Sequence, residues 1–387
     1  MKRTYVLKRS LMKALIQTVD AIGSLAVRRS PVPPLSPSQI ENVLFIRLDQ
    51  IGDIVTTLPA IDSLKTLFPN AEITGLAGTE GAELLYGHSG IDRLIILHEH
   101  WLRRDSHRKL FTPELKKLLP QLKEISFDIG IDFRGDLRNI LLMKWIGVKY
   151  TIGYGATGGG WLLDSEIPYD PNLHAVKKSL QCLSPFSPST PLPLTVPRID
   201  FHSFTSAQET FHWLKQQWNL SSPFIAAHPT AGTPSKEWPL ENWLYLVQKL
   251  LSERNEPIVL VGGDRKKSGN IVSALSNERL IDASGMTNLR ELAVLLSQAK
   301  LFISCDSGPA HIAAAVGTPT LVIASGTNVP SVWLPTHPHV KVISHAVDCS
   351  PCEMSICPKE HHWCMEGITV MKVLEEAESL TGRGAKK

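Results

Sequence analysis

Short apolar runs alternate with stretches of helical spacing along most of the chain. Runs typical of buried β-strands lie at residues 43–48, 72–76, 94–97, 128–132, 224–228, 258–261, 301–304 and 320–323. Apolar residues at helical spacing predict helices at residues 54–68, 113–124, 136–145, 172–183, 241–253, 289–298, 310–316 and 369–380. Strands that alternate with helices predict an α/β protein with mostly parallel sheets covered by helices on both faces.

Two Pro-rich segments divide this pattern. Residues 31–37 (PVPPLSP) form a stiff linker, and residues 184–197 combine Pro and Ser with few charges. We therefore expect four parts: a basic helical arm with its linker at 1–40, two Rossmann-like domains at 41–195 and 196–368, and a closing helix and tail at 369–387. Both domains are expected to be doubly wound and to face a central cleft, with ligands at the carboxyl ends of the strands. The segment GYGATGGG at 153–160 is expected to be a flexible loop.

Charge is concentrated at the N-terminus. The net charge of +3 over 387 residues is too small to indicate a nucleic-acid partner. Residues 1–30 hold seven Lys and Arg against a single acid, Asp20, so the rest of the chain is slightly acidic. The basic character therefore belongs to the arm.

The arm has helical spacing with two interpretations. Its apolar residues are Leu7, Leu11, Leu15, Val19 and Ile22. They predict either an amphipathic helix on an anionic membrane surface or a helix packed on the first domain. No run reaches the roughly 18 apolar residues of a spanning helix, and charges interrupt any signal-peptide core. We expect a cytoplasmic protein, with peripheral contact to the membrane through residues 1–30 under the first interpretation.

The segment 301–323 has the pattern strand, Gly turn, helix, strand. Asp306 and Ser307 favour a helix N-cap, Pro309 suits the first helical position, and Gly308 allows close backbone approach. The free N–H groups and the dipole of such a helix start suit a phosphate or diphosphate. An ordinary well-capped crossover would show the same pattern.

The first strand is followed by RLDQIGD at residues 47–53. It lacks the Gly-Lys-Ser/Thr signature of a P-loop, which excludes that class of nucleotide-hydrolysing enzyme. Asp53 lies where the next helix begins, so its carboxylate either caps that helix or serves as a general base.

The first strand of the second domain leads into HPTAGTPSKEWP at residues 228–239. Thr230 and Lys236 are candidate phosphate contacts. Asp264 is the last residue of VGGD, a turn at the end of a predicted strand. Its carboxylate either accepts hydrogen bonds from ribose hydroxyls or stabilises the turn. In the first domain, Arg134 and Arg138 follow a strand and either bind carboxylates or phosphates of a ligand or form surface salt bridges.

Four of the six cysteines crowd into one segment, at Cys349, Cys352, Cys357 and Cys364. Cys-x2-Cys is a zinc half-site, but the other spacings are irregular for a zinc ribbon. We expect a structural thiol cluster and keep zinc as the alternative.

These motifs together resemble the ADP-heptose:lipopolysaccharide heptosyltransferase family, glycosyltransferase family 9. The pieces that carry the resemblance are NVLFIRLDQIGDIVTTLPA (42–60), KEWPLENW (236–243), ISCDSGPAHIAAAVGTPTLVI (303–323) and CSPCEMSICPKEHHWCMEGIT (349–369). The resemblance covers residues 42–380 and implies a two-domain GT-B fold. It also implies an inverting reaction without a cofactor or catalytic metal, an ADP-heptose donor on the second domain and a lipid-linked acceptor on the first.

The resemblance also implies roles for particular residues. Asp53 matches the proposed general base, and Lys236 matches the lysine near the donor diphosphate and sugar. Further donor-binding positions are Thr230, Asp264, Met286, Asp306, Ser307, Gly308 and His311. The expected function is transfer of heptose to a lipopolysaccharide inner-core acceptor. The alternatives are a relative with another nucleotide-sugar or acceptor, and a non-catalytic nucleotide-sugar-binding protein.

Overall fold

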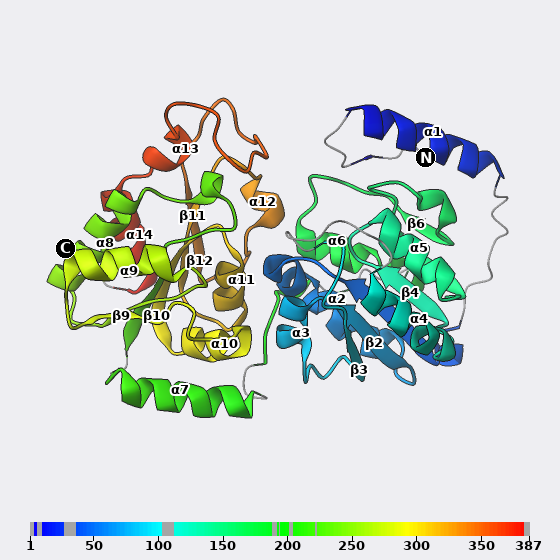
Figure 1. Ribbon diagram of the computed structural model, residues 1–387, viewed down its shortest axis with the longest axis horizontal. Helices are drawn as coiled ribbons and strands as arrows, with labels where there is room; N and C mark the ends of the chain where they lie inside the picture. The colour runs from blue at the N-terminus through cyan, green and yellow to red at the C-terminus, as the bar shows by residue number, and fades with distance from the viewer. Residues whose placement is uncertain are drawn as a thin grey trace. The chain divides into compact units, whose positions relative to one another are not determined.

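The computed structural model describes residues 4–5, 10–26, 36–102, 112–187, 192, 194–200, 204–220 and 223–382. The chain folds as two compact units, Met1–Thr195 and Val196–Lys387. The division falls inside the segment rich in Pro and Ser at 184–197. In Figure 1 the first unit runs from blue to green and the second from green to red.

The first unit contains one parallel sheet. Its strands are β1 (Asn42–Arg47), β2 (Glu72–Ala77), β3 (Arg93–Ile96), β4 (Ile129–Asp132), β5 (Tyr150–Tyr154) and β6 (Ser165–Ile167). They lie in the order β3-β2-β1-β4-β5-β6, and every neighbouring pair is parallel. The helices of this unit are α1 (Ser10–Ala26), α2 (Ile51–Leu67), α3 (Thr79–Leu85), α4 (Pro113–Glu124), α5 (Leu137–Trp145) and α6 (Ala175–Gln181).

The second unit repeats this topology. Its strands are β7 (Phe224–His228), β8 (Ile258–Leu260), β9 (Leu280–Asp282), β10 (Ala299–Cys305), β11 (Thr320–Ala324) and β12 (Val340–Ser344). Their order is β12-β11-β10-β7-β8-β9, again parallel throughout. The helices are α7 (Thr205–Gln217), α8 (Leu240–Glu253), α9 (Arg265–Leu275), α10 (Leu289–Ser297), α11 (Gly308–Ala315), α12 (Pro330–Trp333), α13 (Trp363–Glu366) and α14 (Val370–Leu380).

Both sheets therefore have the same doubly wound strand order, with a topological switch point between their two central strands. The switch point lies between β1 and β4 in the first unit and between β7 and β10 in the second. In doubly wound sheets, ligands bind outside the carboxyl ends of the strands at this point. A ligand site is therefore expected at the loops that follow these four strands.

The central strands are buried on both faces, which is why the sequence shows them as continuous apolar runs. All of β7 and β11 is buried, as is β1 after its first residue. In the second unit, Trp238 and Trp243 pack edge to face with ring centroids 5.5 Å apart, fully buried in the core. These cores fix the strand ends from which the loops leave.

The predicted α/β class with two doubly wound parallel sheets is confirmed, and all eight predicted strands are present. Among the described residues, the sequence analysis missed nine strands and α-helices: β5, β6, β9, β12, α3, α7, α9, α12 and α13. The strands β6 and β9 have three residues each, too few to show a period. Helix α9 is polar, with the sequence RKKSGNIVSAL, and gives no clear apolar stripe.

The glycine-rich segment 153–160 is not the flexible loop that the sequence suggested. Its first two residues belong to β5, and Gly158, Gly159 and Gly160 are buried. Helix α1 covers them: the Gly159 N–H donates to Asp20 Oδ1 at 2.9 Å. The arm is thus packed on the first unit, as the second interpretation predicted. Leu7 lies outside the described residues.

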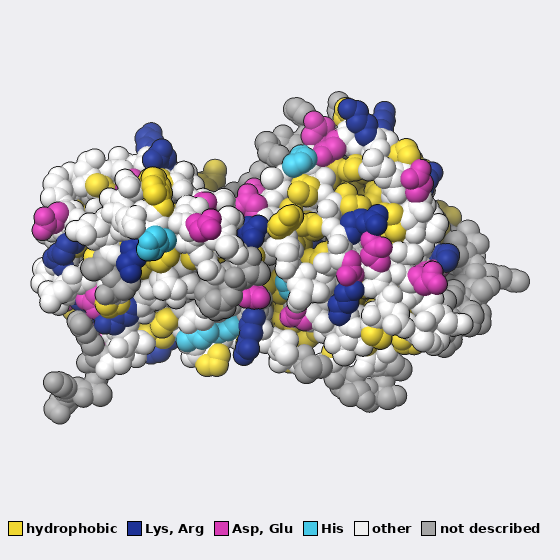
Figure 2. Space-filling model, turned by 90° about the horizontal axis from the view of Figure 1, so that it is seen from below, with side chains coloured by type: hydrophobic (Ala, Val, Ile, Leu, Met, Phe, Trp, Pro, Cys, Tyr) yellow, Lys and Arg dark blue, Asp and Glu magenta, His cyan; other side chains and the backbone are white. Residues whose placement is uncertain are grey.

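The charges on one face of the molecule are mixed. On the face that Figure 2 shows, the described Lys and Arg side chains lie among Asp and Glu side chains and form no continuous basic surface. Within the described ranges, no helix is both long enough and apolar enough to cross a membrane.

Candidate active site

The first switch point is built on a buried ion pair. Arg47 ends β1, and Asp49 follows in the turn before α2; both are about 5% exposed or less. Arg47 Nη1 lies 3.0 Å from Asp49 Oδ2, and Arg134, from the loop after β4, pairs with the other oxygen of Asp49. Charges removed from water need such partners. The pairs join the loops after the two central strands.

Asp53 lies in the first turn of α2 beside these pairs. Arg47 donates two hydrogen bonds to the Asp53 backbone oxygen, and its Nη2 lies 3.6 Å from the carboxylate. The helix N-cap is Gln50, with no side-chain capping bond, and the Asp53 side chain is 24% exposed. The capping interpretation is therefore not supported, and the carboxylate is accessible to a proton donor.

Asp132 organises the neighbouring loop from the end of β4. Its fully buried carboxylate accepts hydrogen bonds from the backbone N–H groups of Arg134, Gly135 and Asp136, and from the Asn139 amide, at 2.8–3.1 Å. Burial raises the pKa of Asp132 to about 6, although these bonds lower it. The loop that carries Arg134 is thus held by a single carboxylate.

The two candidate acceptor arginines both have acidic partners. Arg138 makes a fork onto Asp136, with Nε and Nη2 at 2.8 and 2.7 Å from its two oxygens. Arg134 pairs with Asp49 but leaves 40% of its side chain exposed, against 28% for Arg138. Both cations therefore retain an accessible surface for an anionic group, while their positions are fixed by ion pairs.

The second switch point combines neutral hydrogen bonds around His228 with one ion pair. His228 ends β7, and its ring nitrogens lie 3.0 Å from Ser307 Oγ and 3.0 Å from Thr230 Oγ1. Burial lowers the pKa of His228 to about 4, so the ring is neutral near pH 7. Gly262, with φ +124°, keeps space for the ring, because a Cβ there would overlap it. His228 thus orients a hydroxyl from the β7 loop and one from the β10 loop.

Lys236 joins this group from the same loop as Thr230. Its Nζ lies 2.7 Å from Asp306 Oδ2, which also accepts from Asn328 Nδ2 at 3.1 Å. The Lys236 side chain is 22% exposed and that of Asp306 only 9%. A mobile cation held beside the start of α11 can offset the charge of a diphosphate.

The N-terminus of α11 has the predicted form. Its N-cap is Ser307, Gly308 is the first residue of the helix, and a proline follows at once. Ser307 makes no capping bond because its hydroxyl contacts His228 and Ser304 instead. The helix N–H groups therefore lack that cap. His311 lies one turn further on and is 7% exposed.

Two other predicted donor positions lie in the loops after β8 and β9. Asp264 is the N-cap of α9 and accepts from the backbone N–H groups of Lys266 and Lys267, the turn role considered as its alternative. Met286 follows β9 and is 39% exposed. Neither side chain forms a hydrogen bond or ion pair with Lys236, Asp306 or Ser307.

The cysteine segment forms a thiol cluster. Cys364 is buried and Cys349 exposed, and all four are free thiols. Burial raises the pKa of Cys364, and the other three thiols add to the effect. In the described parts of the chain, no three His, Cys, Asp or Glu side chains are arranged to hold a metal ion. The absence of a catalytic metal remains a prediction.

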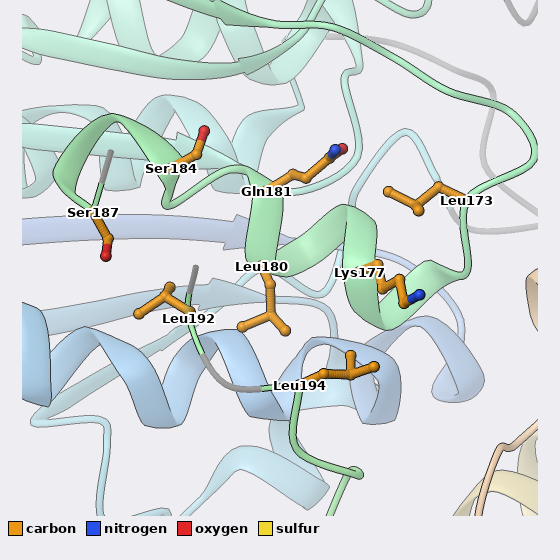
Figure 3. A pocket seen from close by; sticks show the side chains of 8 residues that line it. All are labelled: Leu173, Lys177, Leu180, Gln181, Ser184, Ser187, Leu192 and Leu194. Carbon is orange, nitrogen blue, oxygen red and sulfur yellow. The ribbon is translucent and has the colours of Figure 1, made fainter. Parts of the chain in front are cut away.

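A pocket of about 290 Å³ lies elsewhere in the first unit (Figure 3). It is lined by α6 and the segments that flank it, and its apolar lining includes Leu180, Leu192 and Leu194. None of the predicted site residues lines it.

Sequence reasoning assigned no role to Arg47, Asp49, Asp132 or His228. Three of them share a signal that could have found them: Arg47, Asp132 and His228 are polar residues at the last position of a buried strand. In a doubly wound sheet such residues point to the carboxyl edge.

Comparisons with known proteins identify the family of this chain. The model of glycosyltransferase family 9 (heptosyltransferase) matches residues 115–362. The lipopolysaccharide core heptosyltransferase OpsX of Haemophilus influenzae is 25% identical over 74% of this chain and 80% of its own length. Lipopolysaccharide heptosyltransferase 1 of Pseudomonas aeruginosa is 24% identical over 81% of this chain and 87% of its own.

The fold is shared with a solved structure of ADP-heptose lipopolysaccharide heptosyltransferase II from Escherichia coli. The TM-score is 0.71 at 21% identity, over 89% of this chain and 100% of that one. The family model covers more than half of the sequence and includes both switch-point loops of the second unit. The chain is therefore a glycosyltransferase that belongs to glycosyltransferase family 9, the heptosyltransferase family.

Proposed function

We propose that this protein transfers heptose from ADP-heptose to an inner-core acceptor of lipopolysaccharide, with inversion at the anomeric carbon. The observation that carries the proposal is the pair of switch points: an accessible carboxylate held by Arg47 in the first unit, and Lys236 beside the start of α11 in the second. The names of its relatives supply the sugar and the acceptor class.

Asp53 acts as the general base. It takes the proton from an acceptor hydroxyl as the oxygen forms a bond to the anomeric carbon and the bond to the diphosphate breaks. A positioned base typically contributes 10²–10⁴-fold to a rate. Arg47 fixes the backbone of Asp53 and therefore acts as a positioning residue.

The leaving ADP is stabilised by the second unit. Lys236, the N–H groups at the start of α11 and the hydroxyls of Thr230 and Ser307 offset the charge that builds on the diphosphate. Asp306 orients Lys236 and accepts hydrogen bonds from hydroxyl groups of the donor sugar. The remaining donor positions that we propose are Asp264, Met286, Gly308 and His311. Metal-free turnover is part of the proposal.

The acceptor side lies in the first unit. Arg134 and Arg138 bind anionic groups of a lipid-linked oligosaccharide through their exposed surfaces. Such an acceptor belongs to a membrane, so we propose a cytoplasmic protein in peripheral contact with the inner membrane.

The test is a transfer assay with purified protein, ADP-heptose and a de-acylated inner-core acceptor, in the presence of a chelator. Formation of the heptosylated product and ADP in equal amounts supports the proposal. Calorimetry with ADP, UDP and GDP identifies the nucleoside: preference for UDP or GDP overturns the donor, and no binding of any of the three indicates a non-catalytic protein.

A further inference from the structure

Helix α1 has one face fastened to the first unit. Asp20 is 2% exposed and accepts hydrogen bonds from the Gly159 N–H at 2.9 Å and the Tyr5 hydroxyl at 2.8 Å. A side-chain carbon at Gly23 would overlap the Trp161 ring, and one at Gly158 would overlap Ile16. These close approaches fix the rotation of the helix about its own axis.

The opposite face of α1 is apolar and exposed. It carries five aliphatic side chains that are 50–87% exposed: Leu11, Leu15, Val19, Ile22 and Leu25. With 3.6 residues per turn they fill a stripe about 120° wide, centred roughly opposite Asp20. In Figure 1 the helix lies at the outer edge of the first unit. The stripe is therefore not core surface of that unit.

Charge identifies what would cover this stripe. Residues 1–30 carry Lys2, Arg3, Lys8, Arg9, Lys13, Arg28 and Arg29. Their single acid, Asp20, is buried and bonded inward. An apolar stripe flanked in sequence by positive charge complements a surface with an apolar interior and anionic groups. A second copy of the chain would instead bring like charges together.

We propose that the apolar face of α1 docks on an anionic lipid bilayer, while its inner face holds the first unit in a fixed orientation to that surface. The aliphatic side chains enter the boundary between headgroups and acyl chains, and the net positive charge of residues 1–30 attracts the anionic headgroups. The proposal rests on the proposed function only for the reason to dock, namely that the acceptor lies in a bilayer. Lipid binding itself does not depend on catalytic turnover.

The test is co-sedimentation of the full-length protein with phosphatidylcholine vesicles, with and without phosphatidylglycerol. The double variant Leu15→Glu with Ile22→Glu places two charges on the apolar face. The matched control, Gln17→Glu with Ala21→Glu, adds the same charge at exposed positions on the flank of the helix. We expect wild type to bind anionic vesicles, the first variant to bind at least about tenfold more weakly, and the control to lose only about threefold or less.

Equal losses in the two variants, or no binding of wild type to anionic vesicles, would overturn the proposal. So would a dimer in lipid-free solution that only the Leu15/Ile22 variant dissociates, because a second copy would then cover the face. Unchanged thermal unfolding shows that both variants are folded. Transfer to a de-acylated acceptor is measured in parallel: its absence with vesicle binding intact contradicts the proposed function and leaves the docking surface standing.

Discussion

The two switch points occupy the same topological position but differ in chemistry: buried charges hold the first, whereas the second combines a neutral histidine with one ion pair. In the first unit, Arg47, Asp49 and Arg134 hold the loops together with buried charges. In the second, the neutral ring of His228 holds two hydroxyls. The sheet fixes where a site forms, and the residues after each strand fix what it does. We assign proton transfer to Asp53 in the first unit and diphosphate binding to Lys236 and its neighbours in the second.

The largest expected effect is on turnover. Asp53→Asn retains the shape of the side chain but cannot take a proton, so we expect kcat to fall by about 10²–10⁴-fold with the donor KM nearly unchanged. Initial-rate kinetics with varied ADP-heptose measures both. Asp62→Asn, which changes a half-exposed carboxylate on the same helix, serves as the control and should retain activity. Full turnover of Asp53→Asn would remove this residue from the role of base.

The next effect separates the two regions by pH. Burial raises the pKa of Asp132 to about 6, above its unfolded value of about 4, so its contribution to stability is present below about pH 4 and lost as pH rises through 6. Burial lowers the pKa of His228 to about 4, from about 6.5 unfolded, so its contribution is present above pH 6.5 and lost as pH falls through 4. Each contribution is limited to about 3 kcal/mol.

Urea unfolding of Asp132→Asn and His228→Gln between pH 4 and 7 checks this contrast. Relative to wild type, the free energy of unfolding of the Asp132 variant should decrease as the solution is acidified, because wild type gains stability when Asp132 takes up a proton. That of the His228 variant should increase, because wild type loses stability when His228 takes up a proton. The comparison fails if both differences change with the same sign.

Donor affinity gives a smaller effect, confined to the second region. Lys236→Ala removes a cation next to the diphosphate, and we expect the donor KM to rise about 10- to 100-fold. Lys300→Ala is a close control, because Lys300 also pairs with a nearly buried carboxylate, Glu256 at 2.7 Å, but at the opposite end of β10. If both variants behave alike, Lys236 has only a structural role.

The smallest effect is expected on the acceptor. Replacing both Arg134 and Arg138 by Ala should raise the acceptor KM by about tenfold and leave the donor KM unchanged. The control is Arg93→Ala, which removes an exposed ion pair between Arg93 on the edge strand β3 and Glu72 on β2. It should change neither KM. Unchanged acceptor kinetics in the double variant would refute the acceptor role.

Local signals predicted much of the fold and part of the site. Continuous apolar runs located the buried strands, and the turn before α11 followed from Ser307 and Pro309. The links between loops were not predictable in the same way, because they join residues far apart in sequence: Arg134 pairs with Asp49, and Ser307 with His228. The arm shows the same limit, since spacing alone could not identify Gly159 as the partner of Asp20.

The division of labour is tested most directly by ADP calorimetry on three proteins: wild type, Asp53→Asn and Lys236→Ala. We expect Asp53→Asn to bind ADP as tightly as wild type, because the Asp53 carboxylate takes a proton from the acceptor hydroxyl and does not contact ADP. We expect Lys236→Ala to bind ADP at least about tenfold more weakly. Weakened ADP binding in Asp53→Asn, or unchanged binding in Lys236→Ala, would contradict the assignment of the two chemistries to the two switch points.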